Sequence, residues 1–184
     1  VEGLEAELDA ILAAASESEE TPLSLRTGRR LLVRRTSFRR EVQRQPLSAA
    51  FKLELEARNP YEEAETPTTT NWTVTESGAT CAIDVAGTVS SRPRIRLVAS
   101  GDIVGPSFSD GTRTLTYPGI VWDGAELILD AATGRVSRGL EDVTPYTTGL
   151  IPHLTPPSTT LTYTDDEESS HTATVTIEHR ARWW

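Results

Sequence analysis

Side chains that could carry out catalysis are few in this sequence. The only cysteine, Cys81, lies in the apolar segment CAIDVAG, which favours a buried, inert thiol over a reactive one. His171 and His179 are near opposite ends of the last predicted strand, roughly 26 Å apart at the rise of a strand, and His153 lies in a proline-rich stretch. No hydrolase, zinc-protease or nucleotide-binding motif occurs. We therefore predict that the chain is not an enzyme and has no catalytic, cofactor-binding or metal-binding residues.

Carboxylates are plentiful, and two kinds of site could use them. The acidic run at 165–168 could bind calcium, because hard cations take several oxygen ligands, but a solvated hairpin tip is the favoured interpretation. A glycosidase needs two carboxylates at a defined separation, and nothing in the sequence selects two of them as a pair. A hydrolase with an unrecognised carboxylate pair is therefore kept as the third functional hypothesis.

Aromatic residues bear on a second hypothesis, that of a carbohydrate-binding module. Such a module needs exposed aromatic rings that stack on sugars. Trp72, Tyr117 and Trp122 alternate with polar residues in or beside predicted strands, which favours packing in the core. Tyr146 and Tyr163 are assigned to neither role.

One segment stands out by charge. The chain carries −9 overall, which argues against general nucleic-acid binding, yet the stretch from 26 to 44 holds eight arginines and one acid, Glu41, for a local charge of +7. Because arginine suits protein interfaces, we predict contact with an acidic protein partner, with an ordinary solvated strand face as the alternative. The candidate interface residues are Arg26, Arg29, Arg30, Arg34, Arg35, Arg39, Arg40 and Arg44.

Composition and periodicity predict a mostly β chain. Threonine supplies 26 of the 184 residues, and its branched Cβ suits strands. Residues 4–15 have an apolar stripe at helical spacing and predict a short amphipathic helix. Two short strands joined at Thr27-Gly28 follow, and then a strand at 48–58 with strictly alternating faces. No apolar run approaches the roughly 20 residues that span a bilayer, and no signal-peptide pattern is present.

Beyond a boundary near residue 60, short strands follow one another closely. The density of strands and of glycine-containing turns predicts an antiparallel sandwich or barrel. Residues 140–158, with four of the 11 prolines, are predicted to form a long loop over the sheet. The predicted strands lie at 71–76, 80–89, 94–99, 112–117, 125–130, 135–138, 159–164 and 172–180.

Three stretches, taken in order, resemble the distal tail proteins of long-tailed bacteriophages. They are FKLELEARNPYEEA at 51–64, LTYPGIVWDGAELILDAATGRV at 115–136 and the ending ATVTIEHRARWW at 173–184. The resemblance implies a structural protein of the virion tail tip. Its N-terminal domain would form a ring, commonly a hexamer, that joins the tail tube to the tip or baseplate, and a galectin-like β-sandwich would project outward.

On this resemblance, residues 1–60 are expected to be the C-terminal part of the ring, or belt, domain, and residues 61–184 the galectin-like sandwich. The strands that the family has before the helix are missing and the sequence begins with valine, so we expect a trimmed or processed piece. The expected partners are copies of the chain in a ring, with the arginine stretch facing the acidic helix of a neighbour, and the tail tube and hub proteins. Neither nucleic acid nor a membrane is expected. The alternative function, a carbohydrate-binding sandwich, would take a host-surface glycan as its partner.

Overall fold

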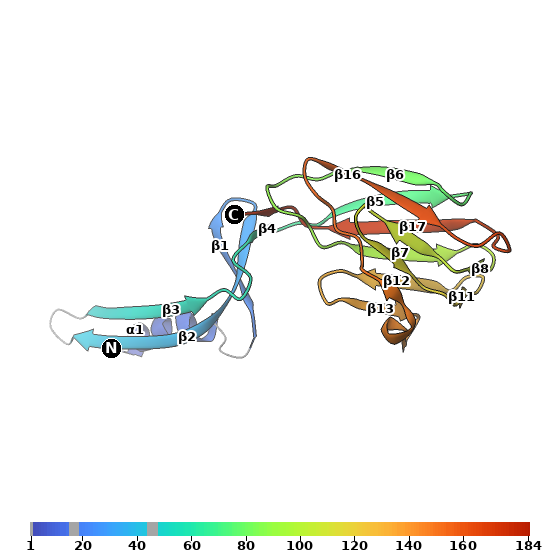
Figure 1. Cartoon of the computed structure of the whole chain (residues 1–184). Coiled ribbons are helices and arrows are strands. Elements are labelled where there is room, and N and C mark those ends of the chain that lie inside the picture. The colour runs from blue at the N-terminus through green and yellow to red at the C-terminus, as the bar shows by residue number, and fades with distance from the viewer. Residues whose placement is uncertain (1, 15–18, 44–47) are drawn as a thin grey trace. The chain divides into compact units, whose positions relative to one another are not determined.

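The chain divides into two compact units. The computed structural model describes residues 2–14, 19–43 and 48–184. Unit 1 comprises residues 1–65 with Trp184, and unit 2 comprises residues 66–183 (Figure 1). The elements of unit 1 are α1 (Glu2–Ala14), β1 (Thr21–Arg26), β2 (Arg29–Gln43), β3 (Ser48–Glu56) and β4 (Glu62–Ala64).

Strand β2 is the centre of unit 1 and pairs antiparallel with β1, β3 and β4. The predicted turn at Thr27-Gly28 is confirmed, and Gly28 has the positive φ of 75° that the tight turn requires. Instead of a short strand, however, β2 continues for 15 residues and forms a long ribbon with β3. A bulge at Thr36 shifts the register by one residue, so that Phe38 pairs with Leu53 and shares its face.

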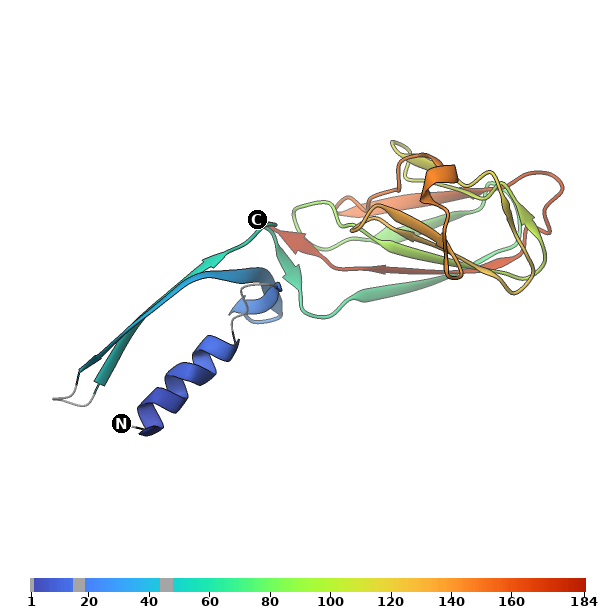
Figure 2. The same ribbon diagram turned by 90° about the horizontal axis from the view of Figure 1, so that it is seen from below.

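Helix α1 lies along the apolar face of this ribbon (Figure 2). The predicted alternation in β3 is confirmed there, because Leu53 and Leu55 face Ile11 of the helix across an apolar cavity of about 290 Å³. Among the described side chains of unit 1, Leu8 and Val33 are the only buried hydrophobic ones. Unit 1 therefore has a thin core.

Unit 2 is a sandwich of antiparallel sheets, seen as layers in Figure 1. In order, the six-stranded sheet is β14 (Glu141–Asp142), β13 (Arg135–Arg138), β12 (Glu126–Asp130), β7 (Arg94–Ala99), β17 (Ala173–His179) and β5 (Thr68–Val74). The five-stranded sheet is β15 (Thr148–Gly149), β10 (Thr114–Thr116), β9 (Ser107–Ser109), β16 (Ser158–Thr164) and β6 (Thr80–Asp84). A small pair, β8 (Ile103–Val104) with β11 (Ile120–Val121), and the short β18 (Arg182–Trp183) complete the unit.

The core of unit 2 lies between the two large sheets. Alternate residues of each strand point inward, as the burial pattern of β17, buried at every second position, illustrates. The inward side chains include Leu97, Leu127 and Val175 from the six-stranded sheet and Phe108 and Tyr163 from the five-stranded sheet, all nearly inaccessible to solvent. This single continuous core contrasts with the thin core of unit 1.

The predicted fold class, mostly β with antiparallel sheets and one short helix, is confirmed. Strands β7 and β13 have the predicted bounds, and the other predicted strands are present with ends shifted by a few residues. The two- and three-residue strands β4, β8, β9, β11, β14, β15 and β18 were not predicted. The segment 140–158 is largely loop, as expected, with β14, β15 and a 3-10 turn at Thr144–Tyr146 within it. No helix in the described ranges is long and apolar enough to cross a membrane.

Candidate functional site

The candidate interface arginines follow β1 and β2 of unit 1. Arg44 lies outside the described residues, and the other seven are described. On either side of the turn between β1 and β2, Arg26 and Arg29 both form ion pairs with Glu62, with nitrogen–oxygen distances of 3.4 and 3.3 Å. Arg30 approaches Glu63 at 3.7 Å. These three cations are therefore compensated by carboxylates of β4.

Farther along β2, the arginines on the two faces of the ribbon have different partners. On the face away from the helix, Nε and Nη2 of Arg34 donate to Glu56 at 3.0 and 2.7 Å. On the helix face, Arg35 donates to the carbonyl of Leu12 at 2.9 Å, where a helix leaves its last carbonyls without partners. Arg40 pairs with Asp9 of the helix at 3.3 Å. The acidic helix thus compensates part of the arginine stretch within the same chain.

Arg39 differs from its neighbours. It is exposed and makes no hydrogen bond or ion pair with the described residues, apart from a coulombic effect that helps to lower the pKa of Glu54. Lys52, paired with Arg39 across the ribbon, bonds Glu54 at 2.6 Å, and Phe51 beside it is 49% exposed. The structure therefore does not gather the predicted arginines into one open cationic face, and Arg39 is the uncompensated one among those described.

Two expectations about unit 2 are wrong. Trp122 is 54% exposed, at the turn after β11, whereas the predicted core positions of Tyr117 and Trp72 are confirmed, with Trp72 partly buried. Of the acidic run expected at a solvated tip, Asp166, Glu167 and Glu168 are exposed as predicted, whereas Asp165 has no exposed side-chain surface. It accepts a 2.8 Å hydrogen bond from the Tyr163 hydroxyl and lies 2.8 Å from Nδ1 of His171. Burial, and then this bond, raise the pKa of Tyr163.

Cys81 and His179, which the sequence analysis considered for catalysis and set aside, lie on different strands. Cys81 packs against the core and is partly buried, and burial raises the pKa of its thiol, which lowers the fraction of reactive thiolate. His179 is buried in β17, and burial lowers its pKa. In the described part of the chain, no three histidine, cysteine, aspartate or glutamate side chains are grouped so that they could hold a metal ion.

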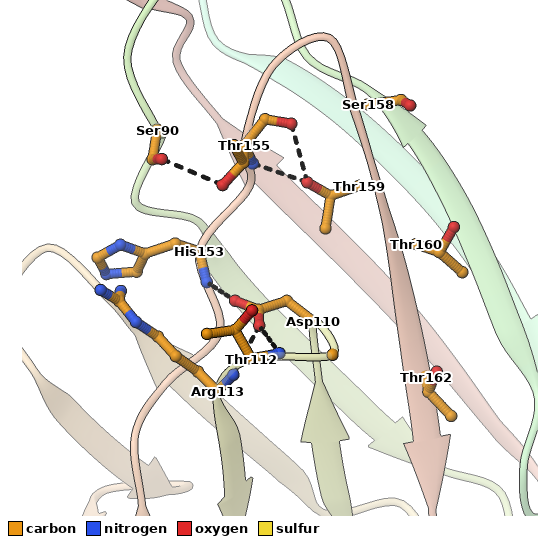
Figure 3. Close-up of a pocket in the computed structure, with 11 residues that line it drawn as sticks. Ser90, Asp110, Thr112, Arg113, His153, Thr155, Ser158, Thr159, Thr160 and Thr162 are labelled. Carbon is orange, nitrogen blue, oxygen red and sulfur yellow. Dashed lines mark hydrogen bonds between the residues drawn. The ribbon is translucent and has the colours of Figure 1, made fainter.

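A polar cavity of about 580 Å³ opens on the outer side of β16, and the sequence did not predict it (Figure 3). One wall is the turn between β9 and β10, which contains Asp110 and Arg113, and another is the segment with His153 and Thr155. The floor consists of outward-facing residues of β16, which carry hydroxyl groups. The cavity is lined by Ser90, Asp110, Gly111, Thr112, Arg113, His153, Thr155, Ser158, Thr159, Thr160 and Thr162.

Asp110 holds the walls of this cavity together. Its Oδ1 accepts the backbone N–H groups of Thr112 and Arg113 at 2.8 and 2.7 Å, and its Oδ2 accepts that of His153 at 2.8 Å (Figure 3). Partial burial raises the pKa of the Asp110 carboxyl, but the three backbone hydrogen bonds outweigh this effect and leave the pKa lowered. A local pattern of aspartate followed by glycine and threonine indicates a turn, whereas the bond to His153 could not be inferred from the sequence.

Arg113 and His153 present their polar ends at the same side of the cavity. Figure 3 shows the guanidinium of Arg113 beside the imidazole of His153. Burial lowers the pKa of His153, and the positive charges of Arg113 and Arg92 lower it further, against the opposite effect of Asp110. The neighbouring arginines therefore disfavour the charged form of His153.

Comparison with known proteins shows similarity in structure but not in sequence. No protein-family model matches the sequence, and no curated protein sequence matches it. The structure is similar to the crystal structure of Dit of phage SPP1, described as a paradigm of the hub adsorption apparatus in phages that infect Gram-positive bacteria. The TM-score is 0.69 at 14% sequence identity, over 96% of this chain and 71% of Dit. The resemblance to phage distal tail proteins is thus confirmed at the level of the fold.

Proposed function

We propose that this protein is a structural component of the tail of a bacteriophage or phage-like particle. In this proposal it forms a ring at the distal tail or baseplate, which joins the tail tube to the tip. Unit 1 is the last part of the ring domain, and unit 2 is a galectin-like sandwich that projects outward. The observation that carries the proposal is the similarity of fold to SPP1 Dit over 96% of the chain. The proposal assigns no catalytic role to the chain.

The thin core of unit 1 supports a role in assembly. A ribbon of few strands is only marginally stable by itself, because it buries too little apolar surface to offset the entropy of ordering. In unit 1 only Leu8 and Val33 are buried among the described hydrophobic side chains, while Leu25 is 64% and Phe51 49% exposed. A neighbouring subunit that covered this surface would complete the core.

Charge suggests which surfaces meet. Arg39 and Lys52 are exposed on the face of the ribbon away from the helix, and Arg39 has no partner among the described residues. Glu5 and Glu7 of α1 are exposed, with no ion pair in the described chain. Because a ring requires two different faces that fit each other, we propose that the ribbon of one copy meets the acidic helix of the next.

Electron microscopy of the parent particle, together with analytical ultracentrifugation of the full chain, tests the proposal. We expect rings in the particle and self-association in solution that weakens as salt is added. The double variant Arg39→Glu/Lys52→Glu should reduce association, and adding Glu5→Arg/Glu7→Arg to the same chain should restore it. Arg94→Glu on the sandwich is the matched control and should leave association unchanged. A protein that is monomeric at all concentrations and absent from the tail ring would contradict the proposal.

A second candidate function, binding of carbohydrate by unit 2, is supported by the cavity on β16. Seven of the residues that line it are serine or threonine. Hydroxyl groups both donate and accept hydrogen bonds, as do those of sugars. A host-surface glycan would be the partner, and screening the full chain against an array of glycans would test this function. Absence of binding across the array would eliminate it.

A further inference from the structure

We propose that the cavity on β16 binds an acidic saccharide, whose anionic group is held by Arg113 and whose hydroxyl groups bond the threonines and serine of the floor. The proposal rests on the carbohydrate-binding function above and adds to it the chemical class of the ligand and the residue that recognises the charge.

The charge argument begins with Arg113, which is half-buried. Its side chain makes no hydrogen bond or ion pair with the described residues. Asp110 is the only acid in the lining, and its two oxygens already accept three backbone N–H groups. The cavity therefore has a guanidinium whose five N–H donors are available to a ligand. A carboxylate or phosphate group is the natural acceptor for this fork of donors.

Arg113 differs from other arginines of the sandwich: three are paired with carboxylates, and Arg92 and Arg94, which have no such pair in the described chain, are exposed rather than half-buried. Arg96 donates to Glu126 at 2.6 Å, Arg135 to Asp142 at 2.9 Å and Arg138 to Glu141 at 2.7 Å. These three pairs lie on the six-stranded sheet. In a chain with a net charge of −9, Arg113 is a half-buried cation, and the one acid of its cavity, Asp110, already accepts three backbone N–H groups; this marks a place where a negative ligand can bind.

The hydroxyl argument depends on which groups remain unused. Ser90, Thr155 and Thr159 bond to one another or to the backbone: the Ser90 and Thr155 hydroxyls are 3.1 Å apart, and the Thr159 hydroxyl accepts the Thr155 N–H at 2.7 Å. The remaining hydroxyls have no hydrogen bond within the described chain and line the open side. They belong to Thr112, Ser158, Thr160 and Thr162.

The available hydroxyls form an ordered array rather than a scattered set. Ser158, Thr160 and Thr162 are alternate residues of β16 and so point to the same face of the sheet, about 7 Å apart along the strand. Such a row can bond several hydroxyls of one saccharide. A simple inorganic anion would use Arg113 but not this row.

A second cavity indicates that the ligand is longer than one sugar ring. It has a volume of about 440 Å³ and shares Arg113 and His153 with the first cavity. Its other lining residues include Leu115, Val136 and Ile151, so it is more apolar than the first. The cationic end thus lies where the two cavities meet, and a short oligosaccharide could extend to both sides of it.

Titration calorimetry with the full chain at low salt tests the proposal. The acidic probe is trigalacturonate, the neutral probe of equal length is maltotriose, and inorganic phosphate is the third probe. We expect trigalacturonate to bind in preference to the other two. Arg113→Gln should weaken its binding roughly ten- to hundredfold, since it removes charge-assisted hydrogen bonds. Thr160→Val should weaken it severalfold, and Arg94→Gln, which removes an exposed arginine from the six-stranded sheet, should leave it unchanged.

The outcomes separate this inference from the functions proposed above. If maltotriose binds as well as trigalacturonate and Arg113→Gln has no effect, the acidic class is wrong while carbohydrate binding stands. Phosphate binding as tightly as trigalacturonate, with no effect of Thr160→Val, would make this a general anion site and overturn the inference. Failure of a panel of acidic and neutral oligosaccharides to bind would overturn both it and the carbohydrate-binding function. The ring proposal is independent of all three results.

Discussion

Replacing Asp110 by alanine isolates a single long-range hydrogen bond, because the chain contains a matched control. Asp110 Oδ1 accepts the N–H groups of the residues two and three positions ahead, and Oδ2 accepts that of His153, 43 residues away. Asp130, in the hairpin between β12 and β13, makes the same local pair, to Ala132 at 2.9 Å and Thr133 at 3.2 Å. No bond from Asp130 to a distant segment is present in the described chain.

The difference between the two alanine variants should therefore come mainly from the bond to His153, with a smaller part from the attraction between Asp110 and the charge of Arg113. A hydrogen bond with one charged partner contributes about 1.5–3 kcal/mol to stability. Asp110→Ala should thus lower the free energy of unfolding by about 1.5–3 kcal/mol more than Asp130→Ala does. For a domain of this size, the corresponding gap in Tm is roughly 5–10 °C.

The pH dependence offers an independent check on the same carboxylate. The pKa of Asp110 is lowered in the folded protein from its ordinary value of 3.8. Its contribution to stability is therefore complete above that value and is lost as the pH falls through the lower folded pKa. The wild type and Asp110→Ala should accordingly converge in stability in strongly acidic solution and differ fully near neutral pH.

Urea unfolding followed by tryptophan fluorescence at pH 7 measures these differences. Asp110→Asn adds a sharper comparison: it keeps one oxygen for the turn but directs an amide N–H at the N–H of His153, so it should restore little of the long-range bond. Equal losses of stability in Asp110→Ala and Asp130→Ala would refute the reasoning. So would an Asp110→Asn variant as stable as the wild type.

Three further predictions concern the sandwich. Tyr163→Phe removes the hydroxyl that donates to buried Asp165, and should lower the free energy of unfolding in urea by about 1.5–3 kcal/mol. The control Tyr146→Phe, at an exposed ring, should lower it by less than about 0.5 kcal/mol. Equal losses in the two variants would contradict this prediction. Burial lowers the pKa of His179 in the folded protein. The contribution of neutral His179 to the free energy of unfolding should therefore be full above about pH 6.5 and be lost as the pH falls through the folded pKa. His179→Gln, if it folds, should flatten this part of a plot of Tm against pH. Gly149→Ala should lower the free energy of unfolding, derived from Tm, by about 2 kcal/mol or more, because φ is +93° and a Cβ would collide with the Thr114 carbonyl. The control Gly134→Ala, at φ +72° with open space around it, should lower it by only about 1 kcal/mol. A larger loss in Gly134→Ala than in Gly149→Ala would refute the steric argument.

The sequence allowed the elements to be predicted where local signals agree. Strand β7 alternates arginine with apolar residues and is bounded by proline and glycine, so its bounds, Arg94–Ala99, were predicted without error. The short β8 and β9 were missed because they are defined by pairing with later segments, β8 with β11 and β9 with β10 and β16. A strand of two residues has no period that a sequence can display.

The candidate sites also depend on contacts between residues far apart in the sequence, which local patterns do not reveal. The positive charge of the arginine stretch was evident in the sequence, but the carboxylates that compensate it lie on β3, β4 and α1, and only the pairing of strands reveals them. The exposure of Trp122 was missed because it ends a strand, where alternation no longer decides which way a side chain points. Arg113 and His153 are 40 positions apart in the chain, and nothing local to either one predicts their proximity.

The two units bury apolar surface to different degrees, and this difference bears on function. Unit 2 has a continuous core between two sheets, in which residues such as Leu97 and Val175 are fully buried, so its stability does not require a partner. Unit 1 exposes Phe51 and Leu25, and a cavity of about 290 Å³ lies between its helix and its strands. Since apolar surface left in water contributes nothing to stability, covering these side chains would stabilise unit 1, and a neighbouring subunit would do so in the ring that we propose. This difference is what the two proposals require: unit 1 would gain stability on assembly, and unit 2, with a core of its own, could present the cavity of Arg113 to a ligand.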